Sequence, residues 1–197
     1  MLSVSFRNTF PLRQVLTVAI GACIMILGSK IQISQVPVPF TFQTVGALFI
    51  AMTYSPMSAF LSLLTWITMG ASGLSVFAKS VSGPTVLIGP TAGYIWGMLI
   101  AATLMSACQF YCAGFFNGLF SKKAYQEGDS LNFPATVFVG SLGAFLILMM
   151  GWINLSQYLG SVSAWNYGVL PFLMMELLKA IGVAGIISTF QLGKIGR

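Results

Sequence analysis

The sequence predicts an all-α integral membrane protein, folded as a bundle of six transmembrane helices, and three observations support this prediction. Apolar residues make up 57% of the chain and charged residues only 6%, whereas charged residues are about 25% of an ordinary globular domain. The mean hydropathy is +0.91. Long apolar runs alternate with breaks rich in proline, glycine and polar residues, and at ~20 residues per crossing the chain suffices for about six spans. We therefore expect a single membrane domain over residues 1–197, with little chain left for a soluble part.

The first half of the chain is expected to form three spans. These are residues 15–33, 41–54 and 57–70. The first apolar run continues well past Cys23 and no cleavage site follows, so we interpret it as a retained helix and not as a signal peptide. Pro37 and Pro39 interrupt the chain before the second span, because proline cannot continue a regular helix. Ser55 and Pro56 mark a tight turn between the second and third spans.

The second half is expected to form the other three spans. These are residues 90–118, 134–153 and 168–190. A long loop, 71–89, precedes the fourth span, and Pro90 suits the first turn of that helix, where its missing N–H is no loss. A strongly polar loop, 121–133, separates the fourth span from the fifth. A loop rich in serine, glycine and aromatic residues, 154–167, precedes the sixth.

The basic residues indicate how the bundle is oriented, because cytoplasmic loops carry an excess of Lys and Arg. If the N-terminus is cytoplasmic, the basic residues on that side are Arg7, Arg13, Lys122, Lys123, Lys194 and Arg197. Lys30 and Lys79 then lie outside. Both termini are therefore expected in the cytoplasm, with the loops 30–40, 71–89 and 154–167 facing out. The net charge of +6 reflects this topology and contact with anionic lipid headgroups, and we expect no nucleic-acid binding.

The chain lacks the residue patterns of common enzyme classes. It has no histidine, and a Ser-His-Asp set, a carboxylate pair and a Gly-rich phosphate loop are all missing. Cys108 and Cys112 share a helical face, but without histidine or a third nearby thiol we expect no metal site. We therefore expect a protein that is not an enzyme, needs no cofactor and cannot hydrolyse a nucleotide by itself.

One pair of charged residues stands inside the last apolar run. Glu176 and Lys179 are three positions apart, so they lie on one helical face and can partly neutralise each other. A charge near the bilayer centre costs ~2.5–3.5 kcal/mol on insertion scales, so we expect the pair to have a structural or functional role. It is either an ion pair that holds the bundle together or a polar site within it. A helix that enters from outside near Gly168 places Glu176 about 12 Å below its start, and a site there opens outward, as uptake requires.

Three segments carry a resemblance to a known family. Residues 38–44 (VPFTFQT), 89–94 (GPTAGY) and 176–180 (ELLKA), with a weaker match at 76–78 (VFA), together resemble the BioY family. Its members are the biotin-specific substrate-capture subunits of energy-coupling-factor (ECF) vitamin transporters. The resemblance implies a multi-pass protein of the cell membrane that binds biotin with high affinity from outside. It also implies two kinds of partner, a membrane-embedded coupling subunit of the EcfT type and two cytoplasmic ATP-binding subunits.

The chain departs from the family pattern at two positions. The family usually has Asp where this chain has Glu176, so the carboxylate here reaches one methylene further. The family loop after residues 76–78 is usually Gly-rich and uncharged, whereas here it carries Lys79. Both changes touch the expected site.

The resemblance and the chemistry of biotin together suggest the polar residues of that site. Biotin offers a ureido group with two N–H donors and a carbonyl, an apolar ring and chain, and a carboxylate. We expect Glu176 to accept from a ureido N–H, and Thr41 and Gln43 to bond the carbonyl. Lys179 or Lys79 would pair with the carboxylate. A plain cap of the second helix is the alternative interpretation of Thr41 and Gln43.

Aromatic side chains are expected to supply the walls. The candidates are Phe77, Tyr94 and Trp165. Tyr94 can alternatively belong to an interfacial aromatic belt, and Phe77 and Trp165 can be lipid-facing anchors.

The first span carries small residues that allow a second helix to approach closely, among them Ala19, Ala22 and Cys23. The resemblance implies that this face docks on the coupling subunit.

Two other functions remain open. One is a stand-alone secondary transporter coupled to protons through Glu176, although the sequence shows no evident inverted repeat and no relay of membrane carboxylates. The other is an ECF substrate subunit for a different vitamin, against which only the matched segments argue.

Overall fold

Helices make up most of the described chain, in agreement with the predicted all-α class. The computed structural model describes residues 12–33, 38–120 and 131–195, except for the side chains of 190–195. In chain order the elements are α1 (Leu12–Lys30), β1 (Gln32–Ile33), β2 (Phe40–Thr41), α2 (Gln43–Thr53), α3 (Pro56–Ala71), the 3-10 turns η1 (Ala78–Ser80) and η2 (Pro84–Leu87), α4 (Ala92–Tyr111), α5 (Ala113–Phe120), α6 (Phe133–Leu159), α7 (Ser161–Gly168) and α8 (Leu170–Ile195).

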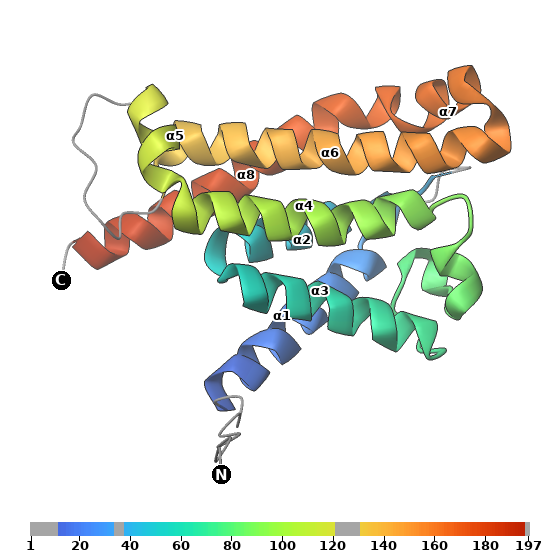
Figure 1. The fold of residues 1–197 in the computed structure, drawn as a ribbon, viewed down its shortest axis with the longest axis horizontal. Helices are drawn as coiled ribbons and strands as arrows, with labels where there is room; N and C mark the ends of the chain where they lie inside the picture. Colours follow the sequence, from blue (N-terminus) through green and yellow to red (C-terminus); the bar gives the residue numbers. More distant parts are fainter. Residues whose placement is uncertain (1–11, 34–37, 121–130, 196–197) are drawn as a thin grey trace, which may run out of the picture.

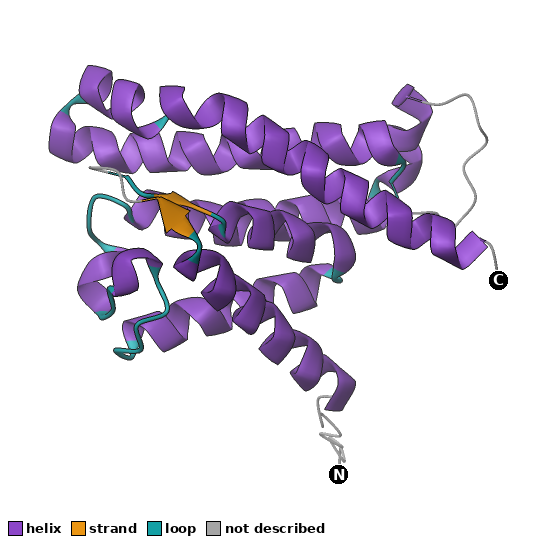
Figure 2. Ribbon diagram, turned by 180° about the vertical axis from the view of Figure 1, so that it is seen from behind, coloured by secondary structure: helices purple, strands orange, loops and turns teal. Residues whose placement is uncertain are grey.

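The long helices pack side by side along the molecule, as Figure 1 shows. α4 contacts α2, α3 and α6, while α8 packs on α6 and α2, and α1 packs on α2 and α3. The strands β1 and β2 pair antiparallel between α1 and α2, with Gln32 opposite Thr41 (Figure 2). The first turn of α1 and the last turns of α8 both lie at the end of the molecule away from α7 (Figure 1). This arrangement gives the bundle two distinct ends.

Local sequence explains where several helices begin. The Ser55 side chain accepts a hydrogen bond from the N–H of Ser58 at the start of α3, directly before Pro56. The Asn132 side chain accepts from the N–H of Ala135 at the start of α6. Such caps satisfy N–H groups that have no partner within the helix. The predicted turn between the second and third spans is therefore confirmed.

Glycines in α4 allow this helix to pack closely on α6. A Cβ atom on Gly93 would collide with the carbonyl oxygen of Met150, and one on Gly97 would lie 3.2 Å from the Cα of Ile147. The backbones of α4 and α6 are thus nearly in contact, which small residues make possible in membrane bundles.

Two expected boundaries are wrong. The expected span 90–118 is divided at Cys112, whose backbone leaves the helical conformation. α5 turns away from α4 there because its buried Asn117 side chain accepts the N–H of Asn132 and so ties α5 to the start of α6. The expected loop 154–167 is almost entirely helical, since α6 continues to Leu159 and α7 follows after Gly160.

The helical structure of this region has a packing reason. Leu155, Ala164 and Val169 are fully buried and form a small second core together with Phe172 of α8. Gly160 supplies the sharp turn between α6 and α7 with a φ of 77°, a conformation that favours glycine. The polar composition of residues 154–167 therefore predicts a loop, although the segment is helical and its apolar positions pack against α8.

Within the described residues, four segments are long and apolar enough to cross a membrane. They are Leu12–Lys30, Ala92–Tyr111, Phe133–Leu159 and Ser161–Thr189. α2 and α3, with 11 and 16 residues, are shorter than the ~20 residues that a perpendicular crossing needs. The chain is thus an all-α protein with several membrane-spanning candidates, and six spans stay a prediction.

The basic residues behind the predicted orientation are only partly described. Arg7, Lys122, Lys123 and Arg197 lie outside the described residues. Lys194 lies in the part of α8 whose side chains are not described.

Candidate functional site

A cavity of about 410 Å³ lies between α2, α4, α6, α8 and the segment 76–91. This volume falls within the range of small-molecule sites, ~300–1,000 Å³. Most of its lining is apolar, and a few polar side chains converge on it. The cavity contains residues from every segment that resembled the BioY pattern, although these segments are far apart in the sequence.

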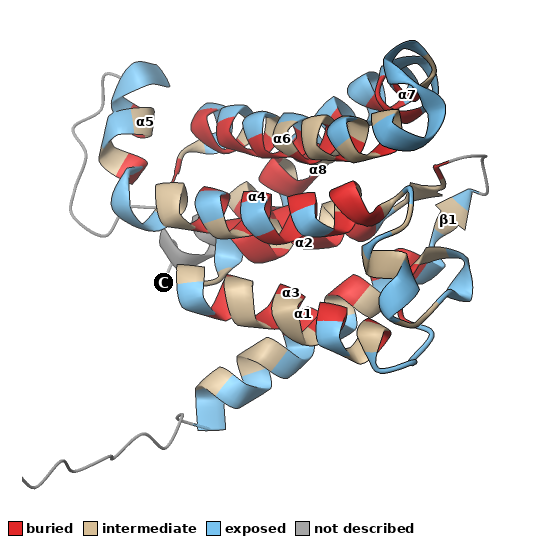
Figure 3. Ribbon diagram, turned by 45° about the vertical axis from the view of Figure 1, so that its right-hand side comes forward, coloured by how far each residue is buried: buried red, intermediate tan, exposed pale blue. Residues whose placement is uncertain are grey.

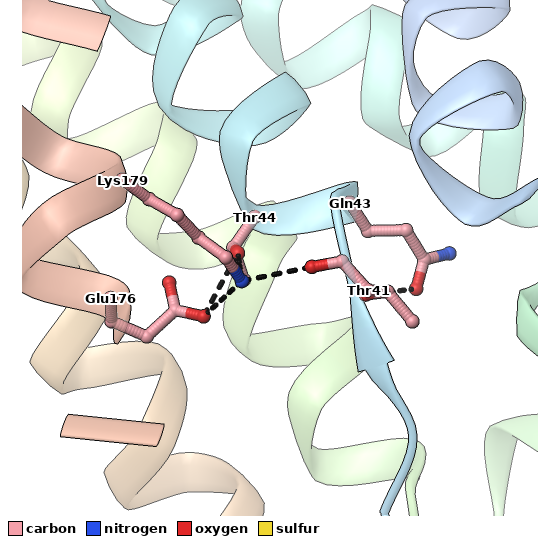
Figure 4. Close-up of polar contacts among 5 residues, drawn as sticks. All are labelled: Thr41, Gln43, Thr44, Glu176 and Lys179. Atoms are coloured by element: carbon pink, nitrogen blue, oxygen red, sulfur yellow. Dashed lines mark hydrogen bonds and ion pairs between the residues drawn. The ribbon is translucent and has the colours of Figure 1, made fainter. Parts of the chain in front are cut away.

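The charged pair of α8 lines this cavity. The Nζ atom of Lys179 lies 2.6 Å from Oε1 of Glu176, and the two side chains are only 8% and 5% exposed. The same ammonium donates to the carbonyl oxygen of Thr41 and to Oγ1 of Thr44, each at 2.8 Å (Figure 4). An ammonium group has three N–H donors, so these contacts use all three. The sequence suggested either an ion pair or a polar site. In the structure the same two residues form an ion pair and also line the cavity.

Thr44 is a site residue that the sequence reasoning missed. Its hydroxyl accepts from Lys179, so its single hydrogen is left for Oε1 of Glu176 at 3.0 Å. A sequence signal was available, because Thr44 lies in the segment 38–44 that resembles the family pattern, three positions after Thr41. Thr44 thus joins α2 to the charged pair of α8.

The second carboxylate oxygen of Glu176 has a different environment. Oε2 is buried and has no hydrogen-bond partner among the described residues. A buried acceptor without a donor carries a desolvation cost of about 1–3 kcal/mol, more when it is charged. The site therefore offers an acceptor for a ligand that brings an N–H or O–H group.

Thr41 and Gln43 line the cavity and do not cap α2. The hydroxyl of Thr41 donates to Oε1 of Gln43 at 3.3 Å. The N-cap residue of α2 is Phe42, whose side chain makes no capping hydrogen bond. Figure 4 shows the amide nitrogen of Gln43 pointing away from Thr41. Both residues therefore line the cavity, and the helix-cap interpretation is wrong.

Two of the three expected aromatic walls line the cavity. Phe77 is only 2% exposed and packs edge-to-face on Trp66, so it is not a lipid-facing anchor. Tyr94 lines the cavity, and its hydroxyl donates to the carbonyl oxygen of Gly168 at 2.8 Å. Trp165 does not line the cavity; it packs edge-to-face on Trp152 and is 36% exposed. The prediction that Trp165 is a wall is wrong, because α7 directs it to the outside of the bundle.

Phe172 takes the place expected for that third wall. It is buried, lines the cavity and stacks on Phe40 with ring centroids 4.7 Å apart. Phe172, Glu176 and Lys179 stand at i, i+4 and i+7 in α8, so they share one helical face. That spacing is the signal that could have found Phe172 in the sequence.

Lys79 also lines the cavity, in an unusual backbone conformation. Its φ is 55°, which is uncommon for a residue other than glycine. Its N–H donates to Oε1 of Gln32 at 2.9 Å. Lys30 binds the same loop through the carbonyl oxygen of Ser75 and Oγ of Ser80. The end of α1 and β1 therefore hold the loop that carries Lys79.

The small residues of α1 differ in exposure. Figure 3 shows the first half of α1 largely pale blue and tan, the colours of exposed and intermediate residues. Ala19 and Cys23 are exposed, whereas Ala22 is 3% exposed and packs in the core. The prediction that Ala22 contributes to a docking face is wrong, because neighbouring core residues cover its side chain.

Among the described residues, no three His, Cys, Asp or Glu side chains come together to form a metal-binding cluster. The site is built from hydroxyl, amide, ammonium and carboxylate groups in an apolar cavity.

Comparisons with known proteins agree with the sequence pattern. A family model described as the BioY family matches residues 5–193. A probable biotin transporter BioY of Pyrococcus horikoshii is 30% identical over 168 residues, which cover 85% of this chain and 90% of that protein. A biotin transporter BioY of Thermotoga maritima is 29% identical over 178 residues, covering 90% and 94%. The crystal structure of an S-component for biotin from an ECF-type ABC transporter resembles this fold with a TM-score of 0.72 at 19% identity, and 93% of each chain is covered.

Proposed function

The chain belongs to the BioY family, and from this premise we propose that it is the biotin-binding subunit of an ECF-type transporter. BioY is a family of transporters, not of catalysts, so this chain captures a substrate and leaves it chemically unchanged. The single observation that carries the proposal is the buried carboxylate of Glu176 in the lining of a ligand-sized cavity, whose oxygen Oε2 has no donor among the described residues.

Biotin matches the polar groups of the cavity at its ring end. A ureido N–H can donate to Oε2 of Glu176, whose other oxygen is already held by Lys179 and Thr44. The amide nitrogen of Gln43 can donate to the ureido carbonyl. The hydroxyl of Thr41 donates to Oε1 of Gln43 and so helps to orient that amide. A site that forms such bonds rejects analogues that lack them, because its own polar groups would then stay buried and unpaired.

Apolar walls match the rest of the ligand. Phe77, Tyr94 and Phe172 line the cavity at different sides, and aromatic rings of this kind pack well against a fused apolar ring and its chain. The cavity therefore offers both polar and apolar groups of the kinds that biotin carries.

The orientation in the membrane follows from this role. We propose six spans in the cell membrane with both termini in the cytoplasm, so that the cavity, at the α7 end, opens outward. α2 and α3 would then be short or tilted crossings. The first turn of α1 and the last turns of α8 lie at the end away from α7 (Figure 1), which supports this orientation.

Energy for transport would come from partner subunits. We propose docking on a membrane-embedded coupling subunit of the EcfT type, with two ATP-binding subunits below it. The exposed residues Ala19 and Cys23 of α1 offer the small-residue surface for that contact. A stand-alone proton-coupled carrier is less well supported, since Glu176 is the one acidic residue within the predicted spans.

Binding of radiolabelled biotin to the purified, detergent-solubilised chain tests the proposal. Unlabelled biotin should displace the label, and thiamine or riboflavin should not. Displacement by either of these vitamins, or no saturable biotin binding, would contradict the assignment.

A further inference from the structure

The cavity reaches the molecular surface beside one segment of its lining, residues 77–91. The exposed residues of the lining are Lys79, Val81 and Pro90, and all three belong to this segment. The other lining residues are buried or half-buried. A ligand that enters or leaves the cavity therefore passes residues 77–91, which form its rim.

Both ends of the rim are anchored to the helices of the bundle. Just before its start, the indole N–H of Trp66 donates to the carbonyl oxygen of Val76 at 3.1 Å. Phe77 is buried and packs edge-to-face on the same tryptophan. Near the other end, the hydroxyl of Tyr158 in α6 donates to the carbonyl oxygen of Ile88 at 2.5 Å. The turn η1 lies between these anchors.

This turn has a backbone conformation that residues other than glycine seldom adopt. Lys79 and Ser80 are both left-handed, with φ of 55° and 54°. Such residues persist where the surrounding structure determines them. The conformation of the turn therefore depends on contacts that it makes with other elements.

Two side chains at the end of α1 and in β1 supply such contacts. The ammonium of Lys30 donates to the carbonyl oxygen of Ser75 at 2.5 Å and to Oγ of Ser80 at 3.3 Å. Oε1 of Gln32 accepts the N–H of Lys79 at 2.9 Å. Neither Lys30 nor Gln32 lines the ligand cavity. These bonds lie at the surface, so they can break without opening the core.

We propose that Lys30 and Gln32 are positioning residues that hold the rim of the cavity in place and so set the rate at which the ligand enters and leaves. The inference rests on the proposed function. Because these bonds join atoms of the chain itself, they oppose entry as well as exit. Removing one should therefore speed both association and dissociation and change the equilibrium affinity little, since association is slow when binding requires a conformational change.

The experiment measures both rates with radiolabelled biotin and the purified full chain. Rapid filtration gives the association rate constant, and a chase with unlabelled biotin gives the dissociation rate constant. Lys30→Met and Gln32→Met remove the polar ends of side chains whose length they nearly keep. Lys30→Arg and Gln32→Glu restore a donor and an acceptor. Ser82→Ala is the matched control, because it changes the same segment at a residue that neither bonds Lys30 nor lines the cavity.

The expected result is a parallel change of the two rate constants. Lys30→Met and Gln32→Met should each raise both of them about 2- to 10-fold, the range that one hydrogen bond supplies, with Kd changed by less than about twofold. Lys30→Arg, Gln32→Glu and Ser82→Ala should keep the wild-type rates. The melting temperature should stay near that of wild type in all five variants.

A reversible cross-link tests the opposite change. Lys30→Cys and Ser80→Cys are combined on a background without the three native cysteines, and the two thiols are joined by a bifunctional methanethiosulfonate reagent. The cross-linked protein should exchange biotin more slowly than wild type, and a reductant should reverse this effect.

Other results would overturn the inference. Wild-type rates in both Lys30→Met and Gln32→Met, or in the cross-linked protein, would show that the rim does not control exchange. Faster dissociation with unchanged association would show that the two residues shape the bound state instead. A lower melting temperature with wild-type rates would assign them a structural role only. Absence of saturable biotin binding to wild type would remove the proposed function, and this inference with it.

Discussion

Replacing Thr44 with valine should weaken biotin binding although the overall shape of the side chain is kept. Valine removes the hydroxyl that donates to Oε1 of Glu176 at 3.0 Å and accepts from Lys179 at 2.8 Å. Without it, α2 no longer fixes the charged pair of α8 through a side chain. Glu176 can then turn, and its carboxylate no longer has one defined orientation.

The magnitude follows from the bonds that remain. A hydrogen bond to a charged group contributes about 1.5–3 kcal/mol. Lys179 keeps Thr41 and Glu176 as acceptors in the variant, and Oε1 of Glu176 keeps Lys179 as a donor. The variant loses two such bonds within the protein. We expect about one bond's worth of this loss to act on binding, through the orientation of Glu176, and biotin affinity to fall about 10- to 150-fold.

The assay is equilibrium binding of radiolabelled biotin to the purified chain, with size-exclusion chromatography as the check for a folded species. Thr44→Ser is the matched control, because it restores the hydroxyl and lacks only the methyl group. It should bind within a few fold of wild type. Wild-type affinity in Thr44→Val would refute the reasoning, and a Thr44→Ser protein as weak as Thr44→Val would assign the effect to packing of the methyl group.

Three further changes test other parts of the structure. The double variant Glu176→Gln with Lys179→Met should still fold, because a matched neutral pair often replaces a buried ion pair at little cost. It should nevertheless fail to retain biotin in a filter-binding assay. Full retention would show that the pair has a structural role only. Gly151→Ala should lower both the melting temperature and the biotin affinity, since the new Cβ would collide with the Tyr94 ring and overpacking costs about 1–3 kcal/mol. If neither quantity changes, the Tyr94 ring can move aside freely. Ala19→Trp should abolish energised uptake in cells and leave binding to the purified chain intact, because Ala19 is exposed; normal uptake would place the partner elsewhere.

Much of the site could be predicted from local sequence. A carboxylate and an ammonium at i and i+3 of an apolar helix must share a face, and Glu176 and Lys179 do lie 2.6 Å apart. Residues 38–44 and 89–94 were singled out by their resemblance to a family pattern, and Thr41, Gln43 and Tyr94 from these segments line the cavity. In each case the prediction depended on neighbours in the sequence or on the pattern itself.

The wrong predictions share a different cause. Trp165 is close in sequence to the site helix but α7 turns it outward, and Phe172 takes its expected role. Ala22 and Ala19 are three positions apart on α1, yet one is buried and the other exposed. Small or aromatic character alone does not tell which neighbour a helix face will meet.

By itself the sequence determined the membrane class, the all-α architecture and the intrahelical ion pair, because hydropathy and helical spacing are properties of single segments. Only the tertiary structure decided that Thr44, 132 positions before Glu176, accepts the third hydrogen bond of Lys179. It also decided that Oε2 of Glu176 has no partner among the described residues. The physical reason is that hydrogen-bond satisfaction is settled across the contact of α2 with α8. The packing of all the helices creates that contact, and neither segment specifies it alone.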